Sequence, residues 1–226
     1  MLVTICRLYD ACSDAGRVII LLRMAGVPAA EISIVANDSD GWYRSSRLTP
    51  TSPKFTAARG PNDGRNQDAA AGAAIRATAT GAGISITMLT LPDIGVVVGV
   101  GWLAARLESI AVRGLAGRLL RVLIGSGIAE DDAPVIAEGV RRGAALVAVR
   151  VQFELAPHLE TLMDHWAVDL KERCALYRET GWLSFDPNAR AYTADQVRCE
   201  RILHACSAGA AIAFQQPRRE GAAYEL

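Results

Sequence analysis

Histidine is the side chain best suited to acid–base and metal chemistry near neutral pH, and the chain has three of them. His158 and His165 are seven residues apart, so on one helix they would lie about 10 Å apart along the axis. That separation is too long for one metal ion. Glu154 and His158 have an i, i+4 spacing that would suit an ion with a third ligand. A solvated polar face explains the same spacing, and we predict no metal and no cofactor.

Neither the cysteines nor the glycines form a recognisable catalytic motif. The five cysteines are at positions 6, 12, 174, 199 and 206, an odd number without a CxxC pair, which indicates reduced thiols in a cytoplasmic protein. The pattern Gly95-x-x-x-Gly99-x-Gly101 resembles a phosphate-binding loop, but it lacks the Lys-Ser/Thr pair that binds phosphate and metal. Helix packing is the expected use of these glycines. We therefore predict that the chain is not an enzyme.

Two further features have competing interpretations. Asp93 is either a buried carboxylate with a raised pKa or part of a solvated turn that caps a helix, and we favour the turn. Trp182, Phe185 and Tyr192 are either a surface that stacks on a ligand or a small core that ties the tail to the sheet. We favour the core.

The elements that would position these residues begin with a β-α-β unit. The spacing predicts a strand over 2–6, a helix over 11–25 capped by Asp10 or Ser13, and a strand over 31–36. Gly26 is a natural helix stop, because glycine tolerates the left-handed conformation there. Residues 37–68 have no hydrophobic period and are predicted to be a flexible linker.

A long apolar segment follows the linker. Residues 81–105 contain one charge, Asp93, and Pro92-Asp93-Ile94-Gly95 interrupts them, which predicts two helices joined by a tight turn. Small residues recur along both halves at spacings that let helix backbones approach closely. The residues predicted to mediate self-association are Ala77, Gly81, Gly95, Gly99 and Gly101.

The second half of the chain repeats the first pattern. A charged helix over 128–142 precedes a strand over 146–151, a helix over 154–165 and a strand over 167–170. We therefore predict an α+β fold of two ferredoxin-like, split β-α-β halves. The predicted boundaries are 1–36 for the first half, 37–68 for the linker, 69–125 for a glycine-rich apolar helical hairpin, 126–170 for the charged helix and second half, 171–205 for a helical tail, and 206–226 for a disordered end. Thr193 and Gln196 have the spacing of a capping box and predict the start of the second helix of the tail.

Four groups of residues carry a family resemblance. They are Ser13–Ala15, Gly26–Pro28 and Ile32–Ala36; Leu91–Gly95; Gly127–Ala133, Glu138–Gly143 and Leu146–Val147; and Ala167–Asp169, Tyr177–Arg178, Gly181–Trp182, Phe185–Asp186 and Tyr192–Thr193. In these stretches the sequence resembles the YflT-type general stress protein family, also called general stress protein 17M-like. The resemblance implies a bacterial, stress-linked protein without established catalytic residues.

Charge and composition narrow the class of partner. Lys plus Arg and Asp plus Glu both number 24, so the chain offers no electrostatic case for nucleic acid. The leading hypothesis is a non-enzymatic, cytoplasmic homo-oligomer that assembles through the apolar hairpin. One alternative is a small-molecule-binding regulatory module of ferredoxin-like fold. Another is a membrane-associated protein, because residues 81–105 are long enough to span a bilayer as one helix, although Pro92-Asp93 near their midpoint argues against a single span. Arg106, Arg113 and Arg121 would share one helix face that suits a membrane surface.

Overall fold

The computed structural model describes residues 1–41, 86–110 and 116–214, with side chains described as far as 204. The rest of the predicted linker, the start of the predicted hairpin with Ala77 and Gly81, and the end of the chain lie outside these residues. The strands are β1 (Leu2–Tyr9), β2 (Ile32–Asn37), β3 (Thr87–Leu91), β4 (Gly95–Val100) and β5 (Ala145–Gln152), and the helices are α1 (Cys12–Met24), η1 (Ala29–Glu31), α4 (Trp102–Ile110), α5 (Arg118–Ile124), α6 (Asp132–Arg141), η3 (Phe153–Leu155), α7 (Ala156–Met163), α8 (Leu170–Glu179) and α9 (Ala194–Phe214).

The strands form one sheet in the order β1-β5-β2-β4-β3, and every neighbouring pair is antiparallel. Because β1 and β2 both run antiparallel to β5, they are parallel to each other with β5 between them. Together with α1 they make a split β-α-β unit, and its two strands and helix lie where the sequence places them. Strands and helices are mixed in the manner of an α+β protein, as predicted.

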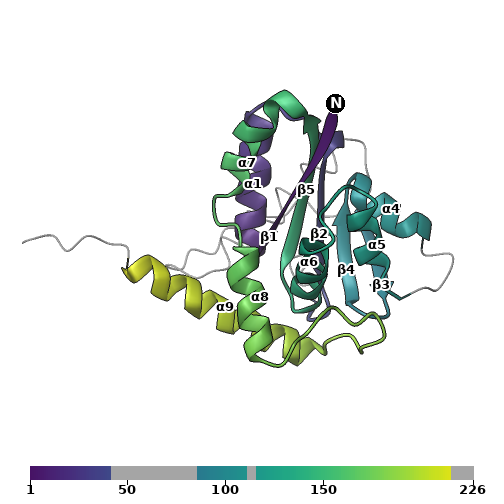
Figure 1. Cartoon of the computed structure of the whole chain (residues 1–226), viewed down its shortest axis with the longest axis vertical. Coiled ribbons are helices and arrows are strands. Elements are labelled where there is room, and N and C mark those ends of the chain that lie inside the picture. Colours follow the sequence, from purple (N-terminus) through teal and green to yellow (C-terminus); the bar gives the residue numbers. More distant parts are fainter. Residues whose placement is uncertain (42–85, 111–115, 215–226) are drawn as a thin grey trace, which may run out of the picture.

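Helices cover both faces of the sheet (Figure 1). One apolar cluster joins α1 and α7 to side chains such as Ile5, Tyr9 and Val147. The other joins α4, α5 and α6 to Cys6, Leu8 and neighbours on the opposite face. Since side chains alternate along a strand, β1 sends its odd-numbered residues to the first cluster and its even-numbered ones to the second. β5 is buried on both faces, which explains its nearly continuous apolar sequence.

The predicted helical hairpin is wrong over the described residues. Residues 87–91 and 95–100 are the strands β3 and β4 of a β-hairpin, and helix begins only at Trp102. The sequence of β4, Gly-Val-Val-Val-Gly-Val, is rich in a β-branched residue that loses less freedom in a strand than in a helix. The turn predicted at Pro92–Gly95 is present, and it joins two strands.

Three predicted seam residues lie against atoms of their own chain. A Cβ at Gly99 would be 2.7 Å from the Cβ of Ala104, and one at Gly95 would collide with the Ser39 hydroxyl. Gly101 has φ of +91° and passes so close to β2 that a Cβ would meet the Ile32 carbonyl. These glycines therefore allow β4 to pack within the chain, and the prediction that they line a helical seam is wrong.

The second β-α-β half is formed only in part. β5, η3 and α7 match the predicted strand and helix, but residues 167–170 do not form a strand. Asp169 instead caps α8 by accepting hydrogen bonds from the backbone N–H of Lys171 at 2.7 Å and Glu172 at 3.0 Å. The segment meets the sheet through one bond, from the Val168 N–H to the Leu8 carbonyl at 2.8 Å.

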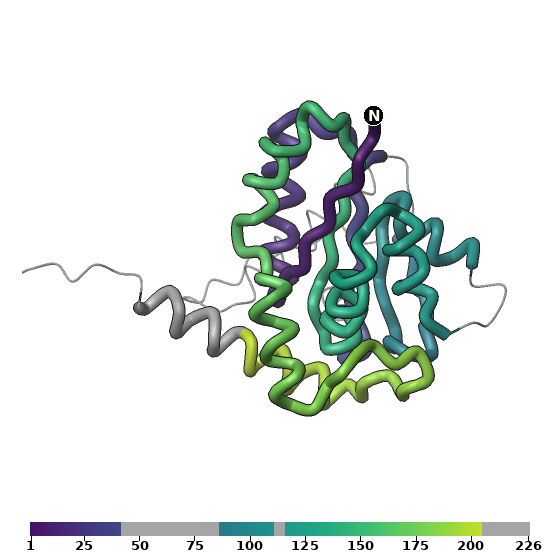
Figure 2. Tube along the Cα trace, viewed as in Figure 1, coloured from purple at the N-terminus to yellow at the C-terminus, as the bar shows by residue number. Residues whose placement is uncertain are grey.

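Two predicted boundaries shift as well. β2 ends at Asn37, and both Asn37 and Asp38 are fully buried, so the first unit extends beyond residue 36. α9 continues to Phe214, so the prediction of disorder from 206 is wrong as far as 214. The start of α9 is as predicted, because Gln196 N–H donates to Thr193 Oγ1 and Thr193 N–H donates to Gln196 Oε1. Figure 2 shows the connection between α8 and α9 passing below the sheet, at the end opposite the N-terminus.

Candidate functional site

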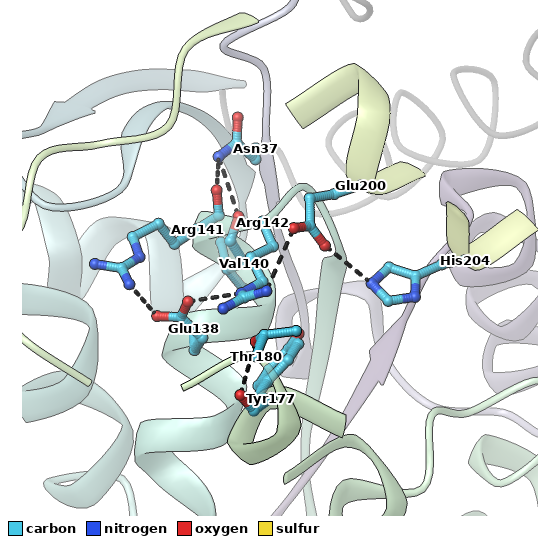
Figure 3. A network of polar contacts seen from close by, with 9 residues as sticks. All are labelled: Asn37, Glu138, Val140, Arg141, Arg142, Tyr177, Thr180, Glu200 and His204. Atoms are coloured by element: carbon cyan, nitrogen blue, oxygen red, sulfur yellow. Dashed lines mark hydrogen bonds and ion pairs between the residues drawn. The ribbon is translucent and has the colours of Figure 1, made fainter. Parts of the chain in front are cut away.

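Among the described residues, charged side chains gather in a cluster where the end of α6 meets α8 and α9 (Figure 3). Two carboxylates that follow β1 and β2 join it. We call it the arginine network, and it consists of Asp10, Asn37, Asp40, Glu138, Arg141, Arg142, Arg173, Tyr177, Glu200, Arg201 and His204.

Glu138 is the centre of this network and is completely buried. Its Oε2 lies 2.6 Å from Nη2 of Arg141 and its Oε1 lies 2.7 Å from Nε of Arg142. The three residues are spaced i, i+3 and i+4 on the last turns of α6, so the helix itself brings them together. A buried carboxylate is tolerated only when its charge is compensated in this way.

Arg142 connects α6 to both helices of the tail. Its guanidinium lies 4.2 Å from the centre of the Tyr177 ring on α8 and 3.3 Å from Oε1 of Glu200 on α9. Desolvation lowers the pKa of Arg142, but the hydrogen bond and charge of Glu138 outweigh it, so the pKa is raised overall. The pKa of Glu200 is lowered, first by its hydrogen bond with His204 and also by the charge of Arg142.

Arg173 and Arg201 hold the tail against the strand ends. Nη2 of Arg173 lies 2.6 Å from Oδ2 of Asp10, which follows β1. Asp10 was predicted as a cap for α1, but that helix begins without a side-chain cap. Arg201 donates to the carbonyls of Asn37 and Gly143 at 2.6 and 3.0 Å and pairs with Asp40 at 2.6 Å.

Asn37 fixes the middle of the arrangement. Its side-chain amide donates to the carbonyls of Ile94, Val140 and Arg141 at 3.1 to 3.2 Å. It therefore ties the end of β2 to the β3–β4 turn and to the end of α6. α6 ends at Arg141, and Gly143 follows with a φ of +116°. Because glycine has no Cβ, Val197 of α9 can approach it closely.

Charges within the network are balanced. Four guanidinium groups, from Arg141, Arg142, Arg173 and Arg201, meet four carboxylates, from Asp10, Asp40, Glu138 and Glu200. Each of these arginines has a carboxylate within 3.3 Å. The network therefore presents no excess of positive charge to attract an anion.

A narrow crevice runs between α6, α8 and α9, and it is too tight to admit a water molecule. The buried atoms there without a hydrogen bond include Oδ1 of Asp10 and the hydroxyl of Tyr177. Burial raises the pKa of Tyr177 to about 12, although the Arg173 charge opposes the rise. The hydroxyl is therefore protonated at neutral pH and cannot act as a base there.

Asp93 is fully buried in the β3–β4 turn, so the solvated turn that we favoured is wrong. Its Oδ2 accepts a hydrogen bond at 3.1 Å from the N–H of Gly117, the residue that precedes α5, while Oδ1 has no hydrogen bond. The favoured interpretation of the tail aromatics agrees with the structure. Phe185 is buried in the second apolar cluster and Trp182 packs against that cluster.

The remaining sequence candidates do not form a site. Arg106 is on α4 while Arg121 and the buried Arg118 are on α5, so they do not share one helix face, and Arg113 lies outside the described residues. Within the described part of the chain, no three His, Cys, Asp or Glu side chains are grouped to hold a metal ion. None of the helices described combines the length and apolar character needed to cross a membrane.

Comparison with protein-family models, with curated proteins and with solved structures finds no match to this chain.

Proposed function

We propose that this chain is a non-enzymatic, stress-linked bacterial protein that acts in the cytoplasm by associating with copies of itself. The stress-linked role rests on the resemblance of its sequence to the general stress protein family. The self-association rests on an exposed apolar cluster at one end of the sheet. The predicted helical hairpin no longer supports it, because residues 87–91 and 95–100 form strands of the chain's own sheet.

The apolar cluster consists of four side chains at the ends of β1 and β5. Met1 is 90% exposed, Leu2 63%, Phe153 63% and Leu155 56%. Met1 and Phe153 are neighbours in space, since the Phe153 N–H donates to the Met1 carbonyl at 2.9 Å. Leu2 and Leu155 lie within two residues of them along the chain, and Leu2 lies opposite Gln152 in the sheet. Single exposed apolar residues are common on proteins, but several large ones at the same end of a sheet favour an interaction surface there.

The arginine network supports a role without catalysis. Its arginines are engaged by carboxylates or by backbone carbonyls, and its buried tyrosine is protonated at neutral pH. The same pairs connect the ends of β1 and β2 to α6, α8 and α9. These contacts account for the cluster as a means of fixing the tail to the sheet.

The test is the mass of the purified protein in detergent-free buffer, measured by light scattering over a range of concentrations. We expect a multiple of the 24.1 kDa chain mass, and Phe153→Asp combined with Leu155→Asp should reduce it. Leu183→Asp is the matched control, because Leu183 is 88% exposed on the connection between α8 and α9, at the opposite end of the molecule. A wild-type protein that remains a single chain at all concentrations would refute the proposal.

A small-molecule-binding role has one observation in its favour, the unpaired Asp10 Oδ1 and Tyr177 hydroxyl in the crevice. A ligand would have to displace α9, because the crevice has no room as it stands. Native mass spectrometry of the purified protein tests this role. If the chain binds a small molecule, the wild-type protein should carry a bound molecule that the Tyr177→Phe variant lacks. A wild-type protein that is as free of ligand as the variant would count against this role.

A further inference from the structure

We propose that β1 pairs with β1 of a second copy of this chain, antiparallel and centred on Thr4, so that the two five-stranded sheets become one continuous sheet. This inference rests on the proposed self-association and names the surface that mediates it. A strand at the edge of a sheet carries unpaired backbone N–H and C=O groups, which are a template for another strand. β1 and β3 are the two edges of this sheet.

The hydrogen bonds at the two ends of β1 show which backbone groups point outward. The Met1 carbonyl accepts from Phe153, beyond the end of β5, so residue 1 faces β5. The Leu8 carbonyl accepts from Val168, which lies on the other side of β1. Because orientation alternates along an antiparallel strand, the odd-numbered residues bond to β5. The backbone groups of Leu2, Thr4 and Cys6 therefore point away from the sheet.

Only the second half of β1 is covered by other described residues. Val168 bonds to Leu8, the Tyr9 hydroxyl donates to the Met163 carbonyl, and Arg7 pairs with Asp164 at 2.6 Å. No described residue makes a hydrogen bond to the outward backbone groups of Leu2 or Thr4. Among the residues that the structure describes, the part of the edge left open is therefore 2–6.

The open edge lacks the features by which proteins keep strands from pairing. Residues 2–6 are Leu-Val-Thr-Ile-Cys, without a charge, a proline or a glycine. The edge also borders the exposed side chains of Met1 and Phe153. On the opposite edge, Arg118 of α5 already donates to the Thr90 carbonyl of β3 at 3.2 Å. These differences favour β1 over β3 as the pairing edge.

A second copy fits this edge because the outward groups are self-complementary. In an antiparallel pair centred on Thr4, Thr4 lies opposite Thr4 and Leu2 lies opposite Cys6 in both directions. Most outward groups of residues 2–6 then gain a partner, with the Cys6 carbonyl already bound by its own Arg7 guanidinium at 3.0 Å. In this register residue 1 of the second copy lies opposite Arg7, next to the bond between Leu8 and Val168.

The proposed register predicts a charge-dependent test at Thr4. Thr4→Lys places two ammonium groups directly opposite each other, and Thr4→Glu does the same with two carboxylates, so each variant alone should associate more weakly than wild type. A 1:1 mixture should associate more strongly than either variant, with less difference at high salt. Rescue in the mixture also shows that both variants fold. Thr4→Pro removes two intermolecular hydrogen bonds and should raise the dissociation constant by about tenfold or more.

Met88→Lys and Met88→Glu are the matched controls, because Met88 is 49% exposed on the other edge strand. We expect sedimentation equilibrium to show no change in their association. If wild type associates but the Thr4 variants associate equally well, or the mixture shows no rescue, the β1 inference fails while the proposed function stands. If wild type is a single chain that Thr4→Pro merely destabilises, the edge is covered by its own chain and both proposals fail.

Discussion

Gly99 offers a direct test of the packing between β4 and α4. In Gly99→Ala the new Cβ would lie 2.7 Å from the Cβ of Ala104, about 1 Å closer than two carbons prefer. Overpacking of this kind costs about 1–3 kcal/mol. Alanine in a strand also stabilises the fold by about 0.5–1 kcal/mol relative to glycine, and this gain offsets part of the cost of the clash. The net loss of unfolding free energy should therefore be about 0.5–2 kcal/mol.

The double variant isolates the clash. Ala104→Gly alone loses about 1 kcal/mol of helix propensity and about 0.8 kcal/mol for the buried methyl group. When it is combined with Gly99→Ala the clash disappears, so the double variant should lose about 1–3 kcal/mol less than the sum of the single variants. Urea unfolding followed by circular dichroism at one protein concentration measures all four proteins. Effects that add within about 0.5 kcal/mol would refute the contact, and a fall in mass for Gly99→Ala would revive an intermolecular role for this glycine.

Three further predictions concern buried and half-buried ionisable groups. Glu138→Gln leaves Arg141 and Arg142 without their buried countercharge and should lower the unfolding free energy, measured in urea, by about 3 kcal/mol. Asp195→Asn, which breaks an exposed ion pair, is the control, and an equally small loss in both variants would show that Glu138 does not stabilise the fold. The pKa of Glu200 is lowered from its ordinary value of 4.5, so its contribution to stability is present above about pH 4.5 and is lost as the pH falls through the lower folded value. Glu200→Gln should therefore reduce the loss of thermal stability between pH 5 and the acid limit, and an unchanged acid limb would be evidence against it. Burial raises the pKa of the Cys6 thiol to about 12, whereas Cys199 is exposed. Mass spectrometry after brief iodoacetamide treatment of the folded protein should therefore find Cys199 modified and Cys6 intact. Equal modification of the two thiols would show that β1 opens readily.

The first unit was accessible to sequence reasoning because its signals are local. Val18, Ile19 and Leu22 follow a helical period, and Gly26 ends the helix with a φ of +86°. The hairpin was missed because short apolar runs do not distinguish helix from strand by period alone. The valines at 96, 97, 98 and 100 were the available signal, and the spacing of the glycines pointed the other way.

Most of the arginine network could not be predicted, because its members are scattered from Asp10 to His204 and meet only through the fold. Its one local signal is the i, i+3, i+4 spacing of Glu138, Arg141 and Arg142. A local signal also contradicts the strand predicted over 167–170. An Asp three residues before a Glu is typical of the start of a helix, and Asp169 and Glu172 have this spacing where Asp169 caps α8.

Amide hydrogen exchange in β1, resolved by residue with NMR at two protein concentrations, shows whether β1 pairs with β1 of a second copy. The N–H of Ile5 bonds to β5 within the chain, whereas the N–H of Thr4 points outward and should gain a partner only in the pair. We predict that Thr4 is protected at high concentration and exchanges rapidly on dilution, while Ile5 stays protected at both. Rapid exchange of Thr4 at every concentration, in a protein that still associates, would show that copies of this chain meet through another surface.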